Sequence, residues 1–263
     1  MPKAALDGIT LNYRLDGDPS GAHLVFANSL GTNLHMWDPI MDLLPDGLRI
    51  LRYDMRGHGE SEVHEPPYSM GALVRDIELL LDMLEFRNCL FVGLSVGGLV
   101  AQGLSVKRLD LVRAAVLSNT GAKIGTADIW DGRIDMIREG GLEAVVDATM
   151  ERWFTKGFRQ SPELDHWSGM MLSTPVDGYV GCAEAIKGTD FYTPTSGLRL
   201  PVLGIAGSDD GATPPDLVRE TVDLVPGSEF ALIRKAGHLP HVEQPEEYAR
   251  LLTDFMKKTG HLS

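Results

Sequence analysis

Three residues that together could carry out nucleophilic acyl chemistry occur along the chain in the order Ser95, Asp210 and His238. A serine hydroxyl is a weak nucleophile near neutral pH, so it attacks a carbonyl carbon only when a base removes its proton. A histidine can act as that base, and a carboxylate fixes the histidine tautomer and stabilises the imidazolium ion. The residue types and their order therefore predict an acyl intermediate on Ser95.

The segment around Ser95 has the form of a strand, a sharp turn and a helix. Ser95 lies between Gly93 and Gly97 in a G-x-S-x-G pattern, which is weak by itself in a chain with 29 glycines. Residues 89–92 are typical of a buried strand and residues 96–106 of a helix. Because backbone must pass close to such a turn, the two glycines fit a nucleophile position better than a purely structural loop.

Two acids compete for the second position. Asp209 and Asp210 both follow the predicted strand at 201–207. The spacing G-x-x-D-x-x-x-P, which begins at Gly207, favours Asp210. The carboxyl ends of parallel strands meet at one edge of a sheet, so we expect Asp210 near Ser95.

Two histidines compete for the base. His238 follows the predicted strand at 229–233, whereas His241 lies shortly before a terminal helix that Pro245 opens. This placement favours His238 as the base and a supporting role for His241. Asp54 also ends a predicted strand, but the turn that follows it favours a structural role through internal hydrogen bonds.

An oxyanion formed by attack of Ser95 needs two backbone N–H donors. Val96, directly after the serine, can supply one of them. The second is expected from residues 28–33, a polar loop after the predicted strand at 23–27, with Leu30 as the candidate. The alternative is that this loop is only a polar connection.

These positions require an α/β fold with a mostly parallel central sheet flanked by helices. A hairpin is predicted at residues 3–15, and strands and helices then alternate up to residue 118. The strand pattern stops between residues 119 and 197, where three of the four tryptophans occur, and it resumes at 201. We therefore predict a hydrolytic core at 1–118 and 198–263 and an inserted helical lid at 119–197.

Composition limits the classes of partner. The net charge is −13 with no basic run, which argues against a nucleic-acid or anionic-membrane surface. No apolar run is long enough for a membrane span, and the N-terminus lacks the apolar core of a secretion signal, so a cytoplasmic protein is expected. Two cysteines far apart indicate neither a disulfide framework nor a metal cluster.

With the three residues in place, the chain resembles the α/β-hydrolases along nearly its whole length. Four segments resemble more narrowly the 3-oxoadipate enol-lactonases of bacterial aromatic catabolism, and the last two, in the lid, are the more specific: FANSLGTN at 26–33, RYDMRGHGES at 52–61, NTGAKIGT at 119–126 and RWFT at 152–155. The resemblance implies hydrolysis of a small anionic enol-lactone to 3-oxoadipate through an acyl-enzyme. It implies no metal or organic cofactor.

The carboxylate of such a substrate needs a cation, which in this acidic protein is expected from the lid. Arg133 is the first candidate, because it follows Trp130 by three residues and a guanidinium suits bidentate carboxylate binding. A solvated surface arginine is the alternative. Lys123 and Arg152 are weaker candidates, and Trp130 and Trp153 are candidate apolar walls.

Other functions remain compatible with the same residues. A carboxylesterase, a carbon–carbon bond hydrolase or a perhydrolase would keep the serine, acid and histidine and change the substrate. A ligand-sensing receptor on the same scaffold would bind with slow turnover. The sequence predicts no particular oligomeric state.

Overall fold

The segments that the sequence predicts as strands form one sheet in the computed structural model, which describes residues 1–262. Eight strands in this part of the chain have the spatial order β1-β2-β4-β3-β5-β6-β7-β8. They are β1 (Lys3–Leu6), β2 (Ile9–Gly17), β3 (Ala22–Ala27), β4 (Leu48–Tyr53), β5 (Cys89–Leu94), β6 (Val112–Ser118), β7 (Val202–Gly207) and β8 (Glu229–Ile233). β2 pairs antiparallel with β1 and β4, and the other pairs are parallel. The predicted mostly parallel sheet is confirmed.

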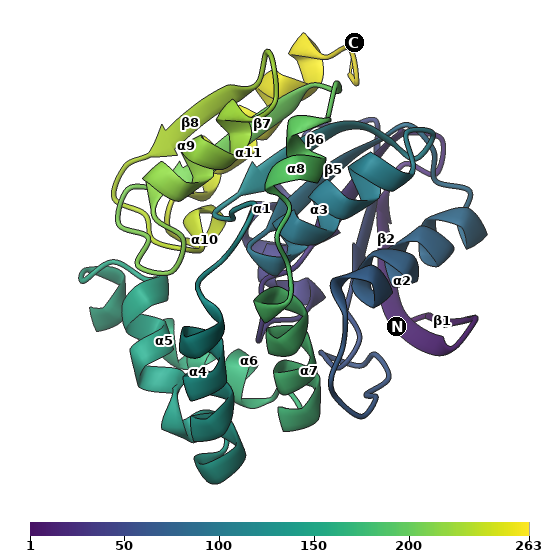
Figure 1. Ribbon diagram of the computed structural model, residues 1–263. Helices are drawn as coiled ribbons and strands as arrows, with labels where there is room; N and C mark the ends of the chain where they lie inside the picture. The colour runs from purple at the N-terminus through teal and green to yellow at the C-terminus, as the bar shows by residue number, and fades with distance from the viewer. Residues whose placement is uncertain (263) are drawn as a thin grey trace.

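Helices cover both faces of this sheet (Figure 1). α2 packs against α3 on one face, and α1 packs against α11 on the other. The helices outside the lid are η1 (Leu34–Trp37), α1 (Asp38–Met41), α2 (Met70–Met83), α3 (Val96–Lys107), α9 (Pro215–Asp223), α10 (Pro240–Glu243) and α11 (Pro245–Lys258). Every residue of β5 and β7 is buried, as expected for central strands of a sheet covered on both faces.

The chain between β6 and β7 is helical. It forms α4 (Ala127–Gly140), η2 (Leu142–Ala144), α5 (Val146–Trp153), η3 (Phe158–Gln160), α6 (Leu164–Leu172), α7 (Val176–Lys187) and α8 (Tyr192–Ser196). Figure 1 shows α4 to α7 grouped beside one end of the sheet, whereas α8 returns along the core. There α8 contacts α3, and the Thr195 hydroxyl donates a hydrogen bond to Gln102 Oε1 at 2.7 Å.

Local chemistry explains where several helices begin and end. The Ser69 hydroxyl accepts a hydrogen bond from Ala72 N–H and starts α2, whose apolar spacing is the clearest in the sequence. The helical segment between β3 and β4 begins at residue 34, where the Asn33 side chain accepts from His35 N–H, and ends at residue 41. No helix within residues 1–262 has both the length and the apolar character needed to cross a membrane.

Candidate active site

Ser95 occupies a strained turn between β5 and α3. Its φ of 59° and ψ of −118° are unusual for a residue with a side chain. A Cβ at Gly93 would lie 2.1 Å from Gly97 O, and one at Gly97 would lie 2.3 Å from Ala27 O. Both glycines are therefore needed for the backbone to pass this close, as the sequence predicted.

The structure pairs His238 with Asp210. His238 Nδ1 lies 2.9 Å from Asp210 Oδ2, and the two residues are 2% and 5% exposed. Asp209 is exposed and accepts a hydrogen bond from the Ser208 hydroxyl. His241 is buried elsewhere, with Nε2 at 2.9 Å from Met36 O. With Nδ1 bound to the carboxylate, Nε2 of His238 is the nitrogen left for a reacting group.

Asp210 is held by more donors than the histidine alone. Oδ2 accepts from Asn119 Nδ2 and from the Thr213 hydroxyl, both at 2.8 Å, and Oδ1 accepts from the N–H groups of Ala212 and Thr213. Burial raises the pKa of the Asp210 carboxyl, but His238 and these hydrogen bonds outweigh burial and hold the pKa below its usual value. The carboxylate is therefore ionised beside the histidine.

Two backbone N–H groups near Ser95 have no acceptor within the part of the chain that the structure describes. Val96 is the first residue of α3, where an N–H has no partner within the helix. In the loop after β3, Ser29 N–H faces Met36 Sδ and Gly31 N–H donates to His58 Nε2 at 3.0 Å. Leu30 N–H, between them, has no acceptor among residues 1–262. These two groups match the donors that an oxyanion would require.

The turn after β4 forms hydrogen bonds with the loop after β3. Asp54 accepts from Leu34 N–H at 2.7 Å, from Asn12 Nδ2 and from Glu60 N–H. His58 is fully buried, and burial lowers its pKa to about 4, so the ring is neutral and accepts from Gly31. The structural role predicted for Asp54 is confirmed.

A cavity of about 170 Å³ opens at Ser95 and His238 beneath the lid. This volume is below the range of about 300–1,000 Å³ that holds drug-sized ligands, so the cavity suits a small molecule. The core contributes Ser29, Leu30, Ser95, Ala212, Thr213 and His238, and the lid segment contributes Ile124, Gly125, Ile129, Trp130, Arg133, Thr149, Arg152, Trp153, Tyr179 and Ile186.

Arg133 is a buried cation that faces this cavity. It is 8% exposed, so it is not the solvated surface arginine that the sequence left open. Nε and Nη2 donate to Tyr179 Oη at 2.9 and 2.7 Å, and Nη2 donates to Thr149 Oγ1 at 2.6 Å. Arg133 forms no ion pair with any carboxylate in residues 1–262. A buried charge without a counter-ion is costly, and an anionic ligand would offset that cost.

The other lid candidates divide into two groups. Trp130, Trp153 and Arg152 line the cavity, and the Trp130 indole donates to Ile124 O at 2.7 Å. Burial lowers the pKa of Arg152, and repulsion from Arg133 lowers it further. Arg152 is therefore a second positive charge near Arg133. Lys123 does not line the cavity. Its neighbours Ile124 and Gly125 do, while Lys123 pairs with Asp190 at 3.2 Å in a partly exposed position.

The end of α5 connects the lid to the loops that carry Asp210 and His238. Gly211 N–H donates to Arg152 O at 3.0 Å, and His238 N–H donates to Trp153 O at 2.7 Å. The Trp153 and His238 rings are stacked with centroids 6.2 Å apart. The lid therefore shares backbone hydrogen bonds with the same loops that position the acid and the base.

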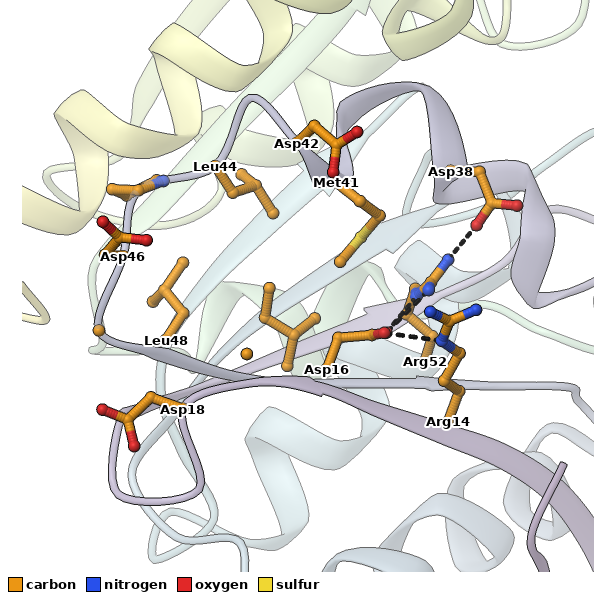
Figure 2. A pocket seen from close by; sticks show the side chains of 14 residues that line it. Arg14, Asp16, Asp18, Asp38, Met41, Asp42, Leu44, Asp46, Leu48 and Arg52 are labelled. Carbon is orange, nitrogen blue, oxygen red and sulfur yellow. Dashed lines mark hydrogen bonds and ion pairs between the residues drawn. The ribbon is translucent and has the colours of Figure 1, made fainter.

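A larger hollow of about 660 Å³ lies beside β2, β4 and α1 (Figure 2). Arg52 is buried there and pairs with Asp16 at 2.7 Å and with Asp38. Arg14 pairs with Asp16 at 2.6 Å. This hollow shares no lining residue with the cavity at Ser95, and its arginines already have carboxylate partners. The smaller cavity, which holds Ser95 and His238, is therefore the candidate active site.

A serine on a strand-to-helix turn, with its acid and histidine on later loops of a mostly parallel sheet, defines the α/β-hydrolase class. Comparison with protein-family models agrees with this class, because residues 24–251 match the α/β hydrolase family. The chain belongs to that family.

Curated relatives and a solved structure are similar over nearly the full length. 3-Oxoadipate enol-lactonase 2 of Acinetobacter baylyi is 34% identical over 95% of this chain and 94% of its own. 3-Oxoadipate enol-lactonase 1 of the same organism is 31% identical over the same shares. The crystal structure of the enol-lactonase from Burkholderia xenovorans is 34% identical, with a TM-score of 0.94, over 97% of this chain and 100% of that one.

Proposed function

We propose that this protein hydrolyses 3-oxoadipate enol-lactone to 3-oxoadipate, as a cytoplasmic step of bacterial catabolism of aromatic compounds. The observation that carries the proposal is the buried Arg133, which faces the same cavity as Ser95 and has neutral protein partners. A lactone with a free carboxylate would supply the missing negative charge. Similarity to three enol-lactonases supports the same substrate.

In the acylation step, Ser95 Oγ attacks the lactone carbonyl carbon while His238 takes the serine proton. Asp210 stabilises the resulting imidazolium. The N–H groups of Leu30 and Val96 bind the oxyanion, and each such donor is worth about 3 kcal/mol in known hydrolases. The ring C–O bond then breaks, and the enolate oxygen leaves while it remains tethered to the acyl group.

The second step releases the acyl group. The His238 imidazolium donates its proton to the leaving enolate oxygen, which makes His238 neutral again. The enol then tautomerises to the ketone, so the ring does not close again. His238 then removes a proton from water, which attacks the acyl carbonyl carbon. When the bond to Ser95 breaks, His238 returns the proton to the serine, and the new carboxylic acid loses its own proton to solvent to give a dicarboxylate product. His238 therefore carries the transferred proton in both steps, and solvent supplies the attacking water.

The direct test follows loss of freshly generated 3-oxoadipate enol-lactone, with para-nitrophenyl esters as comparison substrates. The wild-type protein is expected to hydrolyse the lactone far more efficiently than the simple esters. The Ser95→Ala variant is expected to lose at least about 10⁴-fold in kcat for the lactone. Wild-type activity confined to the simple esters would refute the proposal.

Replacement of the buried cation gives a second prediction. Arg133→Met retains apolar volume and removes the charge, so the carboxylate loses a charged hydrogen-bond donor. The kcat/KM for the lactone is expected to fall by about 10- to 100-fold. Steady-state kinetics measure this change, and an unchanged KM would show that Arg133 does not bind the substrate.

A further inference from the structure

Tyr179, on α7, has a hydroxyl proton that no group in the described residues accepts. Its side chain is 2% exposed, and Oη accepts two N–H bonds from Arg133. A phenol oxygen also carries one proton to donate. No acceptor for that proton occurs among residues 1–262. A buried donor without an acceptor is rare and costly, which indicates that a ligand completes it.

The groups around Tyr179 determine where its hydroxyl proton points. The Arg133 guanidinium approaches Oη through two nitrogens and lies over the Tyr179 ring, with Cζ at 5.6 Å from the centroid. Repulsion between the guanidinium and the hydroxyl proton turns the proton away from Arg133. Tyr179 lines the cavity that holds Ser95, so the cavity is the open direction that remains.

Thr149 has no comparable unused donor. Its hydroxyl accepts from Arg133 Nη2 at 2.6 Å and donates to Val145 O at 2.7 Å. Thr149 therefore holds the guanidinium without offering a proton to a ligand. Arg133 itself keeps Nη1, which has no hydrogen-bond acceptor among residues 1–262. Two donors, Nη1 and the Tyr179 hydroxyl, are left for one ligand group.

The side chains that carry these donors line the same cavity as Ser95. A Cβ on Gly31 would be 3.0 Å from Tyr179 Cε2, so the tyrosine ring rests on the loop that carries Leu30. In the proposed substrate, the ring oxygen, the enol carbon and one methylene separate the carbonyl carbon from the carboxylate. A lactone bound at Ser95 would therefore extend its carboxymethyl arm toward the lid. Arg152 adds positive charge to the same cavity.

We infer that Tyr179 is a specificity-determining residue, whose hydroxyl and Arg133 Nη1 together bind the carboxylate of a small anionic lactone or ester. The inference rests on the proposed hydrolytic function of Ser95 and names how the site selects a charged substrate. A hydroxyl donor beside a guanidinium fixes the carboxylate in one orientation, because each carboxylate oxygen receives its own hydrogen bond.

The test uses two lactones that differ in one group. One is 3-oxoadipate enol-lactone, and the other is the same enol-lactone ring with a methyl group in place of the carboxymethyl arm. Tyr179→Phe keeps the ring and removes the hydroxyl. The ratio of kcat/KM between the charged and the methyl lactone is expected to fall by about tenfold or more. Equal losses for both lactones, or no change in the ratio, would overturn the inference.

Two further variants separate this role from packing and from general charge. Thr149→Val removes an acceptor of Arg133 but no donor to the ligand. The ratio of kcat/KM between the charged and the methyl lactone is therefore expected to fall less in this variant than in Tyr179→Phe. Arg138→Gln removes a charge from the exposed side of the same helix as Arg133. Its ratio is expected to match the wild type, and an effect of Arg138→Gln as large as that of Tyr179→Phe would contradict specific binding.

The wild-type protein provides a measurement that needs no variant. It is expected to prefer the charged lactone over the methyl lactone by about tenfold or more, and equal kcat/KM values would refute the carboxylate site. If the wild type hydrolyses neither lactone, the proposed function fails but the inference is still tested. Para-nitrophenyl hydrogen succinate and para-nitrophenyl butyrate then form the charged and uncharged pair, with the same expected dependence on Tyr179.

Discussion

Asn119 controls the environment of Asp210 from a backbone conformation that few residues tolerate. Its φ is 45°, and Nδ2 donates to Asp210 Oδ2 at 2.8 Å and to Gly237 O at 3.3 Å. Asparagine and aspartate adopt such φ values more readily than other residues with side chains. An aspartate would therefore keep the backbone and replace the donor by a second carboxylate.

Asn119→Asp is expected to lower kcat/KM by about tenfold or more, because two adjacent carboxylates cannot both remain ionised. The pKa of the pair would rise, so activity would be lost at a higher pH on the acid side than in the wild type. A pH profile of kcat/KM measures this shift. Asn88→Asp is the matched control, since Asn88 also has positive φ but is exposed. Identical profiles for Asn119→Asp and wild type would contradict the role of Asn119.

Residues that share a short pattern or a strand end could be predicted from the sequence, and residues that meet through lid packing could not. Ser95, Asp210 and His238 follow predicted strands in a recognisable order, and the structure brings the last two into contact. Tyr179 lies on a helix 46 residues from Arg133, and no spacing rule joins the two. The sequence shows Asn119 as the first residue of the segment NTGAKIGT and does not predict its hydrogen bond to Asp210.

At the scale of elements, the Glu243 carboxylate links the segment after α5 to the loop that carries His238. Glu243 Oε1 accepts from the Thr155 hydroxyl at 2.5 Å, and Oε2 accepts from Gly237 N–H at 2.7 Å. Gly237 directly precedes His238, whose own N–H donates to Trp153 O. Glu243 therefore links the position of the lid to the position of the base.

Glu243→Gln is expected to lower kcat by about tenfold, because its amide nitrogen must face a donor, either Gly237 N–H or a Thr155 group. KM is expected to change less, since Glu243 does not line the cavity. Thr155→Val and the double variant complete a cycle, in which a coupling energy of about 1 kcal/mol is expected. Glu246→Gln, at an exposed position of α11, is the control. Fully additive effects would show that the bridge does not act as a unit.

The core elements were more predictable than the lid elements, because central strands such as β5 and β7 combine a continuous apolar run with a turn at the end. The predicted bounds of β5, β7 and β8 differ from the observed ones by two residues or fewer. The lid was predicted only as helical. Several of its helices are short, and α8, for example, has only one buried residue to give a periodic signal. The helix α10 has only four residues, which is too few to give a periodic signal.

At the scale of the whole molecule, two histidines are buried without charge in the folded protein. Burial lowers the pKa of His58 to about 4 and that of His241 to about 3, from an ordinary value of 6.5. The unfolded chain binds protons at these positions near pH 6.5, whereas the folded protein does not. The stability that the neutral rings contribute is therefore present above about pH 6.5 and lost as the pH falls toward their folded values.

His58→Gln tests this dependence, because a glutamine oxygen can accept from Gly31 N–H and takes up no proton. The unfolding free energy of the wild type is expected to fall between about pH 7 and pH 5, with His58 alone contributing about 2 kcal/mol of that loss. His58→Gln should lose about that much less over the same interval, as measured by urea denaturation at each pH. The exposed His166 supplies the control, and His166→Gln should follow the wild type. Parallel pH curves for wild type and His58→Gln would mean that His58 is not the group whose protonation destabilises the fold.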